Sequence, residues 1–289
     1  EARSVADGRA ELAMGASWGP KWLAQHQRAE FDPPHRFVDV GTVPMLGGKL
    51  GPKLLPWRHQ HDFMEDDGGT LVLDTVVTTV PRRVLAPVFA YRRRQLTDDL
   101  AVHAAMREYA SSELTVAITG SSGTVGTALS ALLMTGGHRV VHLVRRAPRD
   151  LAGSGGVVER QWDPADPDPA MLEGVDVVVH LAGESIAGRF TDEHKATIRD
   201  SRVEPTRALA RISGDRPFVS ASAIGFYGAD RDGPVDETAS AGDGFLAEVV
   251  QAWEEAASAA SGRFVCVRTG IVQSAAGGAL ALQRPLFEA

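Results

Sequence analysis

The sequence predicts a doubly wound α/β domain at residues 113–289, preceded by an α+β domain at residues 1–112. Strand-like and helix-like runs alternate after residue 113, which is typical of a parallel sheet with crossover helices. Three regularly spaced glycines follow the first of these strands, where such folds bind phosphate groups. In the first part, β-branched runs separated by glycine turns lead into one long helical stretch, which indicates an antiparallel sheet with a helix.

The composition of the chain excludes several classes of protein. The 289 residues include 30 Lys and Arg against 37 Asp and Glu, and the net charge of −7 argues against binding to nucleic acid. The single cysteine, Cys266, excludes an intrachain disulfide. No apolar run approaches the roughly 18 residues of a membrane span. We therefore expect a cytoplasmic protein with a small-molecule substrate, and the sequence leaves its oligomeric state open.

Three strands and one helix are expected in the first part of the chain. They are placed, in order, at residues 37–40, 57–63, 70–80 and 84–108. His59 and His61 are two residues apart on one strand and so share a face, an arrangement that can begin a metal site. No third ligand is evident in the sequence, so we expect a polar strand face there and no metal.

The second part is expected to contain five strands and three helices. The strands are placed at residues 115–119, 139–144, 175–180, 218–221 and 264–267. The helices are placed at about 124–135, 191–211 and 244–260. Pro205 should kink or break the second helix, because proline has no N–H and clashes with the preceding turn.

The glycine turn after residue 119 is the strongest chemical signal. Gly120, Gly123 and Gly126 are expected to allow a tight turn, a close approach to a pyrophosphate and close packing of helix on strand. The helix that follows offers free N–H groups and a partial positive charge to an anion. We therefore expect a bound dinucleotide, and the alternative is a glycine-rich turn without a ligand. The expected contacts in this turn are Gly120, Ser122, Gly123, Thr124, Val125 and Gly126.

The end of the second strand favours NADP over NAD. An NAD-binding protein usually carries an acid there, which accepts hydrogen bonds from the ribose. This strand ends instead in Arg145 and Arg146, whose guanidinium groups suit a 2′-phosphate. The alternative is that the two arginines only end the strand in solvent.

Residues 114–289 resemble the short-chain dehydrogenase/reductase superfamily, on the side of its NAD-dependent epimerases and dehydratases. The resemblance rests on five motifs that occur in order: Trp162-Asp163-Pro164, Leu181–Gly188, the Lys195–Arg202 motif, Ser220–Gly228 and Arg268–Val272. It implies an α/β Rossmann fold, with a C-terminal substrate part that this sequence lacks. It also implies cofactor contacts at Leu181, Ala182, Gly183, Ser220 and Ala221. Trp162 either stacks near the adenine or belongs to the core.

Residues 1–110 resemble, more loosely, the last two-thirds of a helix-grip domain of the SRPBCC class. The resemblance rests on Phe37-Val-Asp39, Trp57-Arg-His59, the strand that ends at Pro81 and Phe89-Ala-Tyr-Arg92. It implies a cavity for an apolar ligand in this part of the chain. The chain begins with Glu1, and the strand and helices that open such domains are largely missing, so we expect a protein cut at both ends.

The resemblance also implies catalytic positions, and several of them depart from the usual pattern. Ser222 matches the serine that holds the substrate oxygen. The usual Tyr and Lys fall on apolar residues, either Phe245 and Val249 or Leu246 and Val250. Arg202 occupies the neighbourhood of the usual Asn, where it could supply a positive field. Tyr227, in the loop after the same strand as Ser222, is either a substitute acid or a packing residue.

Two further residues are candidates for substrate contacts. Glu184 either contacts substrate or caps the helix that opens at Thr191. Lys195 and Arg202 are seven residues apart and are expected to share a helix face, where they hold an anionic substrate or form a salt-bridged surface.

The sequence therefore supports two functions from different classes. The first is an NADP-binding, epimerase-family oxidoreductase of unknown substrate, with an N-terminal module for an apolar ligand. The alternative is an NADP-binding sensor or regulator that performs no chemistry, which the apolar Tyr and Lys positions favour.

Overall fold

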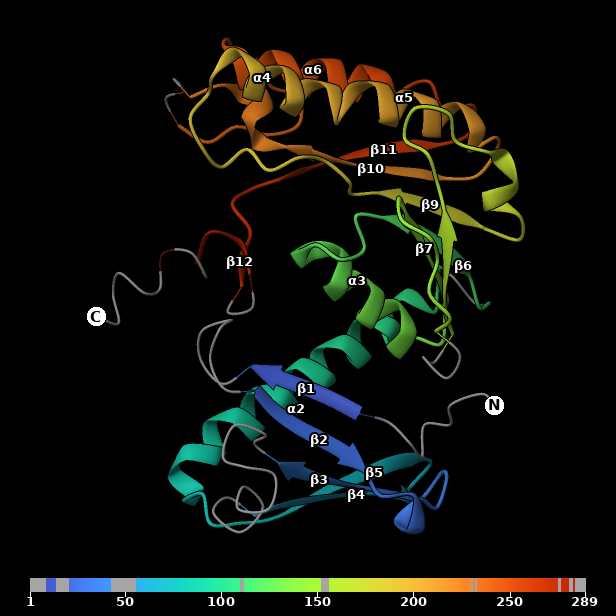
Figure 1. Cartoon of the computed structure of the whole chain (residues 1–289), viewed down its shortest axis with the longest axis vertical. Coiled ribbons are helices and arrows are strands. Elements are labelled where there is room, and N and C mark those ends of the chain that lie inside the picture. The colour runs from blue at the N-terminus through green and yellow to red at the C-terminus, as the bar shows by residue number, and fades with distance from the viewer. Residues whose placement is uncertain are drawn as a thin grey trace. The chain divides into compact units, whose positions relative to one another are not determined.

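The chain divides into two compact units, shown in a computed structural model (Figure 1). One unit comprises residues 1–101 and 152–155, and the other comprises 102–151 and 156–289. The structure describes residues 9–13, 21–42, 56–109, 112–151, 156–229, 231, 233–274, 277–280 and 283. The division falls inside the helix Arg82–Met106, whose last residues, from Val102 on, belong to the second unit. Within that unit, the ring of His103 lies 6.4 Å from the ring of His138.

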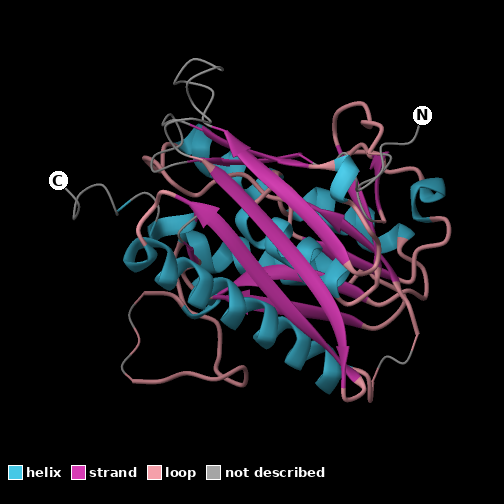
Figure 2. Cartoon of the chain, turned by 90° about the horizontal axis from the view of Figure 1, so that it is seen from below, coloured by secondary structure: helices cyan, strands magenta, loops and turns pink. Residues whose placement is uncertain are grey.

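The first unit is an antiparallel sheet of five strands followed by a long helix, and its strands are magenta in Figure 2. Along the chain the elements are β1 (Arg9–Ala13), β2 (Lys21–His26), the 3-10 turn η2 (Arg28–Glu30), β3 (Arg36–Thr42), β4 (Trp57–Asp66), β5 (Gly69–Thr78) and α2 (Arg82–Met106). Asp67 and Gly68 join β4 to β5 with positive φ angles of 44° and 78°, as a tight hairpin requires.

Helix α2 contacts the sheet through aromatic side chains. The ring of Phe89 stacks on that of Trp57 at 6.4 Å and meets the ring of His59 edge-on at 5.4 Å. The three expected strands and the expected helix correspond to β3, β4, β5 and α2, whereas β1 and β2 were not predicted. The helix-grip assignment of the unit stays a prediction.

The second unit is a parallel sheet of six strands in the order β11-β10-β9-β6-β7-β8. The strands are β6 (Thr115–Thr119), β7 (Arg139–Val144), β8 (Val157–Gln161), β9 (Val177–His180), β10 (Phe218–Ala223) and β11 (Phe264–Thr269). Numbered along the chain, this is the 3-2-1-4-5-6 order of a Rossmann fold, so the predicted fold of this part is confirmed. The order reverses between β6 and β9, and ligands of such folds bind beside that point, at the carboxyl ends of the strands.

Helices cover the two faces of this sheet (Figure 1). They are α3 (Thr124–Thr135) on one face and α4 (Asp192–Asp200), α5 (Val203–Ile212) and α6 (Phe245–Ala257) on the other. The remaining short elements are η4 (Pro169–Leu172), η5 (Ile224–Tyr227) and β12 (Gln273–Ser274). None of the helices in the described part of the chain has the length and apolarity that a membrane crossing requires.

The break predicted near Pro205 is present, and one strand of this unit was not predicted. The helix expected at 191–211 is interrupted at Ser201 and Arg202, so that Pro205 lies in the first turn of α5, where its missing N–H costs nothing. Strand β8 was not predicted, because its charged residues Glu159 and Arg160 obscure the apolar pattern.

A buried pair of polar side chains joins β6 to β9. Thr119 Oγ1 lies 2.7 Å from His180 Nδ1, and both side chains are fully buried. Burial lowers the pKa of His180 from 6.5 to about 4, because the imidazolium form would lose its hydration. The folded protein therefore contains His180 as the neutral imidazole at neutral pH.

This burial predicts a specific loss of stability in acid. Between pH 6.5 and 4 the unfolded chain protonates His180 and the folded chain does not, so the free energy of unfolding falls as pH falls through that window. Between pH 7 and pH 4.5, the free energy of unfolding should fall by roughly 2–3 kcal/mol less in His180→Asn than in the wild type. Urea unfolding at both pH values, followed by tryptophan fluorescence, measures it. Wild-type pH dependence in His180→Asn, or the same change in the exposed control His35→Asn, would contradict the assignment.

Candidate functional site

A hollow of about 860 Å³ opens at the carboxyl edge of the parallel sheet, beside the point where the strand order reverses. Three segments meet in it: the glycine turn after β6, the end of β7 and the loop after β9. Ten of the residues predicted as ligand contacts line it, namely Gly120, Ser122, Gly123, Arg145, Arg146, Trp162, Leu181, Ala182, Gly183 and Glu184. The structure thus brings together residues as far apart in the chain as Gly120 and Glu184.

The glycine turn has the geometry of a phosphate cradle. Gly120 has a φ of +68°, and a Cβ there would come within 2.8 Å of the backbone of Leu181 and Ala182. A Cβ on Gly126 would collide with the carbonyl oxygen of Gly120. Gly123 differs, because a Cβ there would meet only Gly120 O, at 3.3 Å, and the residue lines the hollow. Two glycines are therefore needed for the turn itself, and the third leaves space open beside it.

Helix α3 presents free N–H groups at this turn. Its first intrahelical bond runs from Thr127 N–H to the carbonyl of Gly123, so the N–H groups of Thr124, Val125 and Gly126 precede the hydrogen-bonded ladder. Thr124, Val125 and Gly126, which the sequence predicted as cofactor contacts, are not among the residues that line the hollow. The donor set and the open space at Gly123 fit the pyrophosphate of a dinucleotide.

The rim beyond β7 carries three arginines, Arg145, Arg146 and Arg149, and the last two bind one carboxylate. Arg146 donates two hydrogen bonds to Glu159, of 2.7 and 2.6 Å, and Arg149 Nη2 donates to the same carboxylate at 2.8 Å. The Glu159 side chain is fully buried, and hydrogen bonds from Arg146 and Arg149 hold its pKa well below the ordinary value. Arg145 also lines the hollow. Three cations and one anion leave this rim with a net positive charge.

These contacts change the interpretation of Arg145 and Arg146 as a pair that binds the 2′-phosphate. An acid is absent from the end of β7, as the sequence suggests, but β8 supplies Glu159 beside it, in register with His142. The guanidinium of Arg146 is largely occupied by that carboxylate, whereas Arg149, which the sequence analysis did not single out, joins the rim. The sequence did not reveal Glu159 as the partner of Arg146, because it did not show that β8 pairs with β7.

The loop after β9 is held in place from two sides. Thr119 Oγ1 accepts hydrogen bonds from the N–H groups of Leu181 and Ala182, at 3.1 and 3.2 Å. Arg202 Nη2 donates to the carbonyl of Glu184 at 2.7 Å, and its guanidinium lies 5.3 Å from the Trp253 ring centre. Burial lowers the pKa of Arg202 although the nearby Glu184 opposes that shift. This geometry makes Arg202 a support for the loop.

The two candidate substrate residues have different surroundings from those expected. Glu184 lines the hollow, and its carboxylate accepts from the N–H of Ser185. It does not cap the following helix, because Thr191 does so through its own hydroxyl. Lys195 lies on α4, with its ammonium 5.5 Å from the Phe245 ring centre. Because the helix breaks before Arg202, Lys195 and Arg202 do not share a helix face.

Ser222 and Tyr227 belong to one buried network that does not line the hollow. Ser222 Oγ donates to Glu254 Oε1 at 2.5 Å. Arg268 donates two bonds of 2.8 Å to the same carboxylate and one of 3.0 Å to the Tyr227 phenol oxygen. Burial raises the pKa of Glu254, but hydrogen bonds from Arg268 and Ser222 outweigh it and lower the pKa overall. The sequence analysis did not identify Glu254 as a member of this network.

The positions of the usual Tyr and Lys are apolar in the structure as well. Leu246 and Val250 face η5, since a Cβ built on Gly225 would lie 3.8 and 3.9 Å from them. Phe245 instead contacts Phe190, with ring centres 5.9 Å apart. Both candidate pairs, Phe245 with Val249 and Leu246 with Val250, are apolar and cannot transfer a proton.

The remaining predicted cofactor contacts are part of the core. Trp162 lines the hollow and also meets His180 edge-on at 5.9 Å, so it is both a wall residue and a core residue. Ser220 and Ala221 lie in the middle of β10, and Ser220 Oγ donates to the carbonyl of Ala221. They do not line the hollow, because they precede the carboxyl end of the strand.

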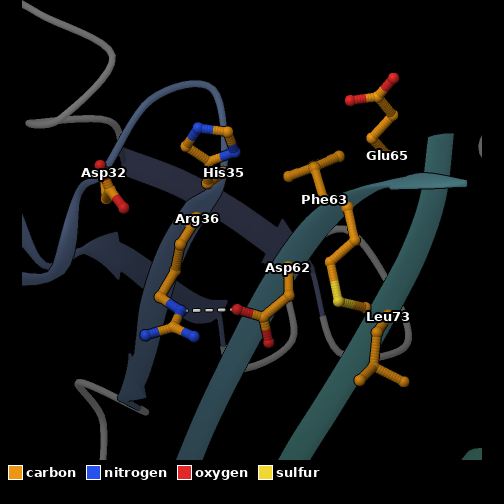
Figure 3. A pocket seen from close by; sticks show the side chains of 8 residues that line it. Asp32, His35, Arg36, Asp62, Phe63, Glu65 and Leu73 are labelled. Atoms are coloured by element: carbon orange, nitrogen blue, oxygen red, sulfur yellow. Dashed lines mark hydrogen bonds and ion pairs between the residues drawn. The ribbon is translucent and has the colours of Figure 1, made fainter.

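A second hollow, of about 500 Å³, lies in the first unit (Figure 3). The ion pair between Arg36 and Asp62, 2.5 Å long, crosses it. Its other lining residues are Asp32, His35, Phe63, Met64, Glu65 and Leu73. Charged and polar side chains outnumber apolar ones, so this hollow adds no support to the prediction of an apolar ligand.

Comparison with known proteins identifies the second unit. Residues 116–248 match the model of the NAD dependent epimerase/dehydratase family. An epimerase family protein of Mycobacterium bovis is 44% identical over 181 residues, which are 60% of this chain and 58% of that protein. A chloroplastic epimerase family protein of Arabidopsis thaliana is 31% identical over 194 residues, which are 61% of this chain and 54% of that protein.

A solved structure from Corynebacterium glutamicum, described as a nucleoside-diphosphate sugar epimerase, is similar over the whole chain. It is 43% identical with a TM-score of 0.80, and the alignment covers 100% of this chain and 61% of that one. The chain thus spans between about half and three-fifths of the length of these relatives. The segment that matches the NAD dependent epimerase/dehydratase family model, residues 116–248, holds the glycine turn, the loop after β9 and Ser222.

Proposed function

We propose that the second unit binds NADP(H) and that the protein is an oxidoreductase or epimerase acting on a small molecule. The observation that carries this proposal is the positive rim of Arg145, Arg146 and Arg149 on the hollow that contains the glycine turn. Guanidinium groups bind phosphate through paired hydrogen bonds, and the 2′-phosphate distinguishes NADP from NAD. The description of the Corynebacterium glutamicum relative makes nucleoside-diphosphate sugars the first substrates to assay.

Three groups of residues would bind different parts of the dinucleotide. The N–H groups at the start of α3 and the space at Gly123 would hold the pyrophosphate. Arg145 and Arg149 would contact the 2′-phosphate, with Arg149 held in position by Glu159. The loop at Leu181, tied to Thr119, would form the floor beneath the nicotinamide.

A bound nicotinamide supplies hydride transfer, and the protein must then supply or remove a proton. We assign that role to Tyr227, whose phenol oxygen accepts a hydrogen bond from Arg268. This guanidinium places beside the phenol the positive charge that a lysine supplies in most short-chain dehydrogenases. Ser222, whose hydroxyl is bound to Glu254, would orient the substrate oxygen after exchanging that bond.

One observation favours a second candidate, a sensor that binds NADP without turnover. Leu246 and Val250 are apolar, and both Ser222 and Tyr227 are satisfied within a buried network. A protein that needs no proton transfer has no use for a phenol and a lysine at those positions. Measuring cofactor binding and turnover separately distinguishes the two functions.

We expect Arg145→Ala to lower the affinity for NADPH by about tenfold or more and to change the affinity for NADH little, because a charge-assisted bond to phosphate contributes roughly 1.5–3 kcal/mol. Isothermal titration with both cofactors measures this. The matched control is Arg139→Ala at the opposite end of β7, where the guanidinium pairs with Glu113. An equal loss of affinity for NADPH and NADH would show that Arg145 does not bind the 2′-phosphate.

We expect Gly123→Val to abolish dinucleotide binding while the unit still folds. The φ of −76° and ψ of 170° at Gly123 are extended values that valine adopts readily, and the added Cβ meets only Gly120 O. The rest of the side chain would occupy the cradle. NADPH fluorescence enhancement and urea unfolding test the two halves of this expectation. Wild-type enhancement in a folded variant would show that the turn is structural only.

If the protein turns over a substrate, we expect Tyr227→Phe to lower kcat by roughly 100-fold or more, the usual contribution of a general acid, and to leave NADPH affinity unchanged. The control is Tyr91→Phe, an exposed tyrosine on α2. Assays on nucleoside-diphosphate sugars and a panel of carbonyl compounds measure both. Full activity of the variant would place the proton donor elsewhere, and tight NADPH binding without any wild-type turnover would favour the sensor.

A further inference from the structure

A cluster of two histidines and two aspartates, of which Asp74 is exposed and the other three are buried, lies in the sheet of the first unit. His59 and His61 lie two residues apart on β4. Asp39 on β3 is directly opposite His59, and Asp74 on β5 is directly opposite His61. The side chains of Asp39, His59 and His61 are buried, and each offers a ligand atom within 4.8 Å of the others. Nothing in the cofactor site accounts for this cluster.

The distances separate the two aspartates by role. Asp74 Oδ1 lies 3.1 Å from His59 Nε2 and 2.7 Å from His61 Nδ1, which are hydrogen-bond distances. Asp39 Oδ2 lies 3.5 Å from His59 Nδ1 and 3.4 Å from His61 Nε2, and the second contact is a long hydrogen bond. Two ligand atoms bound to one tetrahedral metal at 2.0–2.1 Å are separated by about 3.3 Å. The spacing at Asp39 therefore also matches that of ligands around one ion.

The hydrogen bonds of the cluster are compatible with a bound cation. His59 Nε2 bonds to Asp74 Oδ1, and His61 Nε2 makes a long hydrogen bond of 3.4 Å to Asp39 Oδ2. Because a neutral imidazole carries one N–H, a His59 that donates from Nε2 to Asp74 directs the lone pair of its Nδ1 toward Asp39 Oδ2, 3.5 Å away. A divalent cation would take the place of the proton that His61 and Asp39 share, and all three ligand atoms would then bind it.

The surroundings of the cluster are those of a supported metal site. Ligating histidines usually donate their second N–H to a carboxylate, which fixes the ring, and Asp74 does this for His59. The same carboxylate oxygen lies 2.7 Å from His61 Nδ1. The Trp57 indole N–H donates to Asp39 Oδ1 at 3.3 Å and leaves Oδ2 as the ligand atom. Phe37 stacks on His61 at 4.0 Å, and Phe89 meets His59 edge-on. Two carboxylates, two neutral imidazoles and a divalent cation sum to zero charge.

We propose that Asp39, His59 and His61 bind a divalent cation of the zinc type, with Asp74 orienting both histidines. Two imidazoles and one carboxylate suit Zn²⁺, and three protein ligands leave a fourth position for water or an exchangeable ligand. The sequence showed only the two histidines, because the third ligand comes from a neighbouring strand. The site is independent of the cofactor site in the second unit.

The experiment titrates the chelator-treated full chain with Co²⁺ and Zn²⁺. We expect one equivalent of Co²⁺ to give the strong visible absorption of tetrahedral cobalt, and one equivalent of Zn²⁺ to remove it. Asp39→Asn and His61→Gln should each lower Zn²⁺ affinity more than about 100-fold. Asp74→Asn should lower it by roughly 10–100-fold, as loss of an orienting partner does. The control His35→Gln removes an exposed histidine of the same unit and should bind as the wild type does.

Folding of each variant is checked by circular dichroism and by NADPH binding, which depends on the second unit. As a second readout that does not require a variant, Zn²⁺ should raise the Tm of the wild-type chain and leave that of His61→Gln unchanged. The proposal is overturned if the folded, chelator-treated wild type binds neither ion stoichiometrically. It is also overturned if Asp39→Asn and His61→Gln bind as tightly as the wild type. In both cases the cluster holds protons only.

Discussion

The hydroxyl of Thr119 is the contact on which the cofactor site depends. It ends β6, lies 2.7 Å from His180 at the end of β9, and accepts the N–H groups of Leu181 and Ala182. These two strands flank the point where the sheet order reverses, so one side chain sets the distance between the glycine turn and the facing loop. Gly120 can have no side chain for the same reason, because the backbone of Leu181 and Ala182 lies against it.

The charge of the rim depends on a strand that contributes no cation to it. Glu159 on β8 is buried and holds Arg146 and Arg149 together, so the guanidinium groups are positioned before a ligand arrives. Ordering such long side chains costs about 2 kcal/mol of rotamer entropy each when it must occur on binding. The same carboxylate cancels one positive charge of the rim. This lowers the repulsion among the arginines when no ligand is bound, and the rim still has a net positive charge that attracts phosphate.

Features that depend on neighbours in the chain were predictable, and features that depend on strand pairing were not. The glycine turn, the parallel sheet and the break near Pro205 follow from local spacing. The partnership of Glu159 with Arg146, the network of Ser222 with Glu254 and Arg268, and the approach of Asp39 to His59 join residues 13 to 46 positions apart. A single sequence shows which residues share a face of a strand, but it does not show which strand lies beside it. These partners could therefore be named only once the sheet order was known.

The same dependence on pairing bears on how the protein divides its chemistry. In the second unit, Ser222 and Tyr227 are satisfied by Glu254 and Arg268, and a substrate must replace at least one of these bonds to be held by Ser222. In the first unit, Asp39 Oδ2 is held less tightly: it has one long hydrogen bond of 3.4 Å to His61 Nε2 and lies 3.5 Å from His59 Nδ1. Short, charge-assisted bonds stabilise the folded state without a ligand, whereas a long bond between buried groups is replaced at lower cost when a ligand binds. On that criterion the buried histidine pair exchanges its internal contacts for a ligand more readily than Ser222 and Tyr227 do.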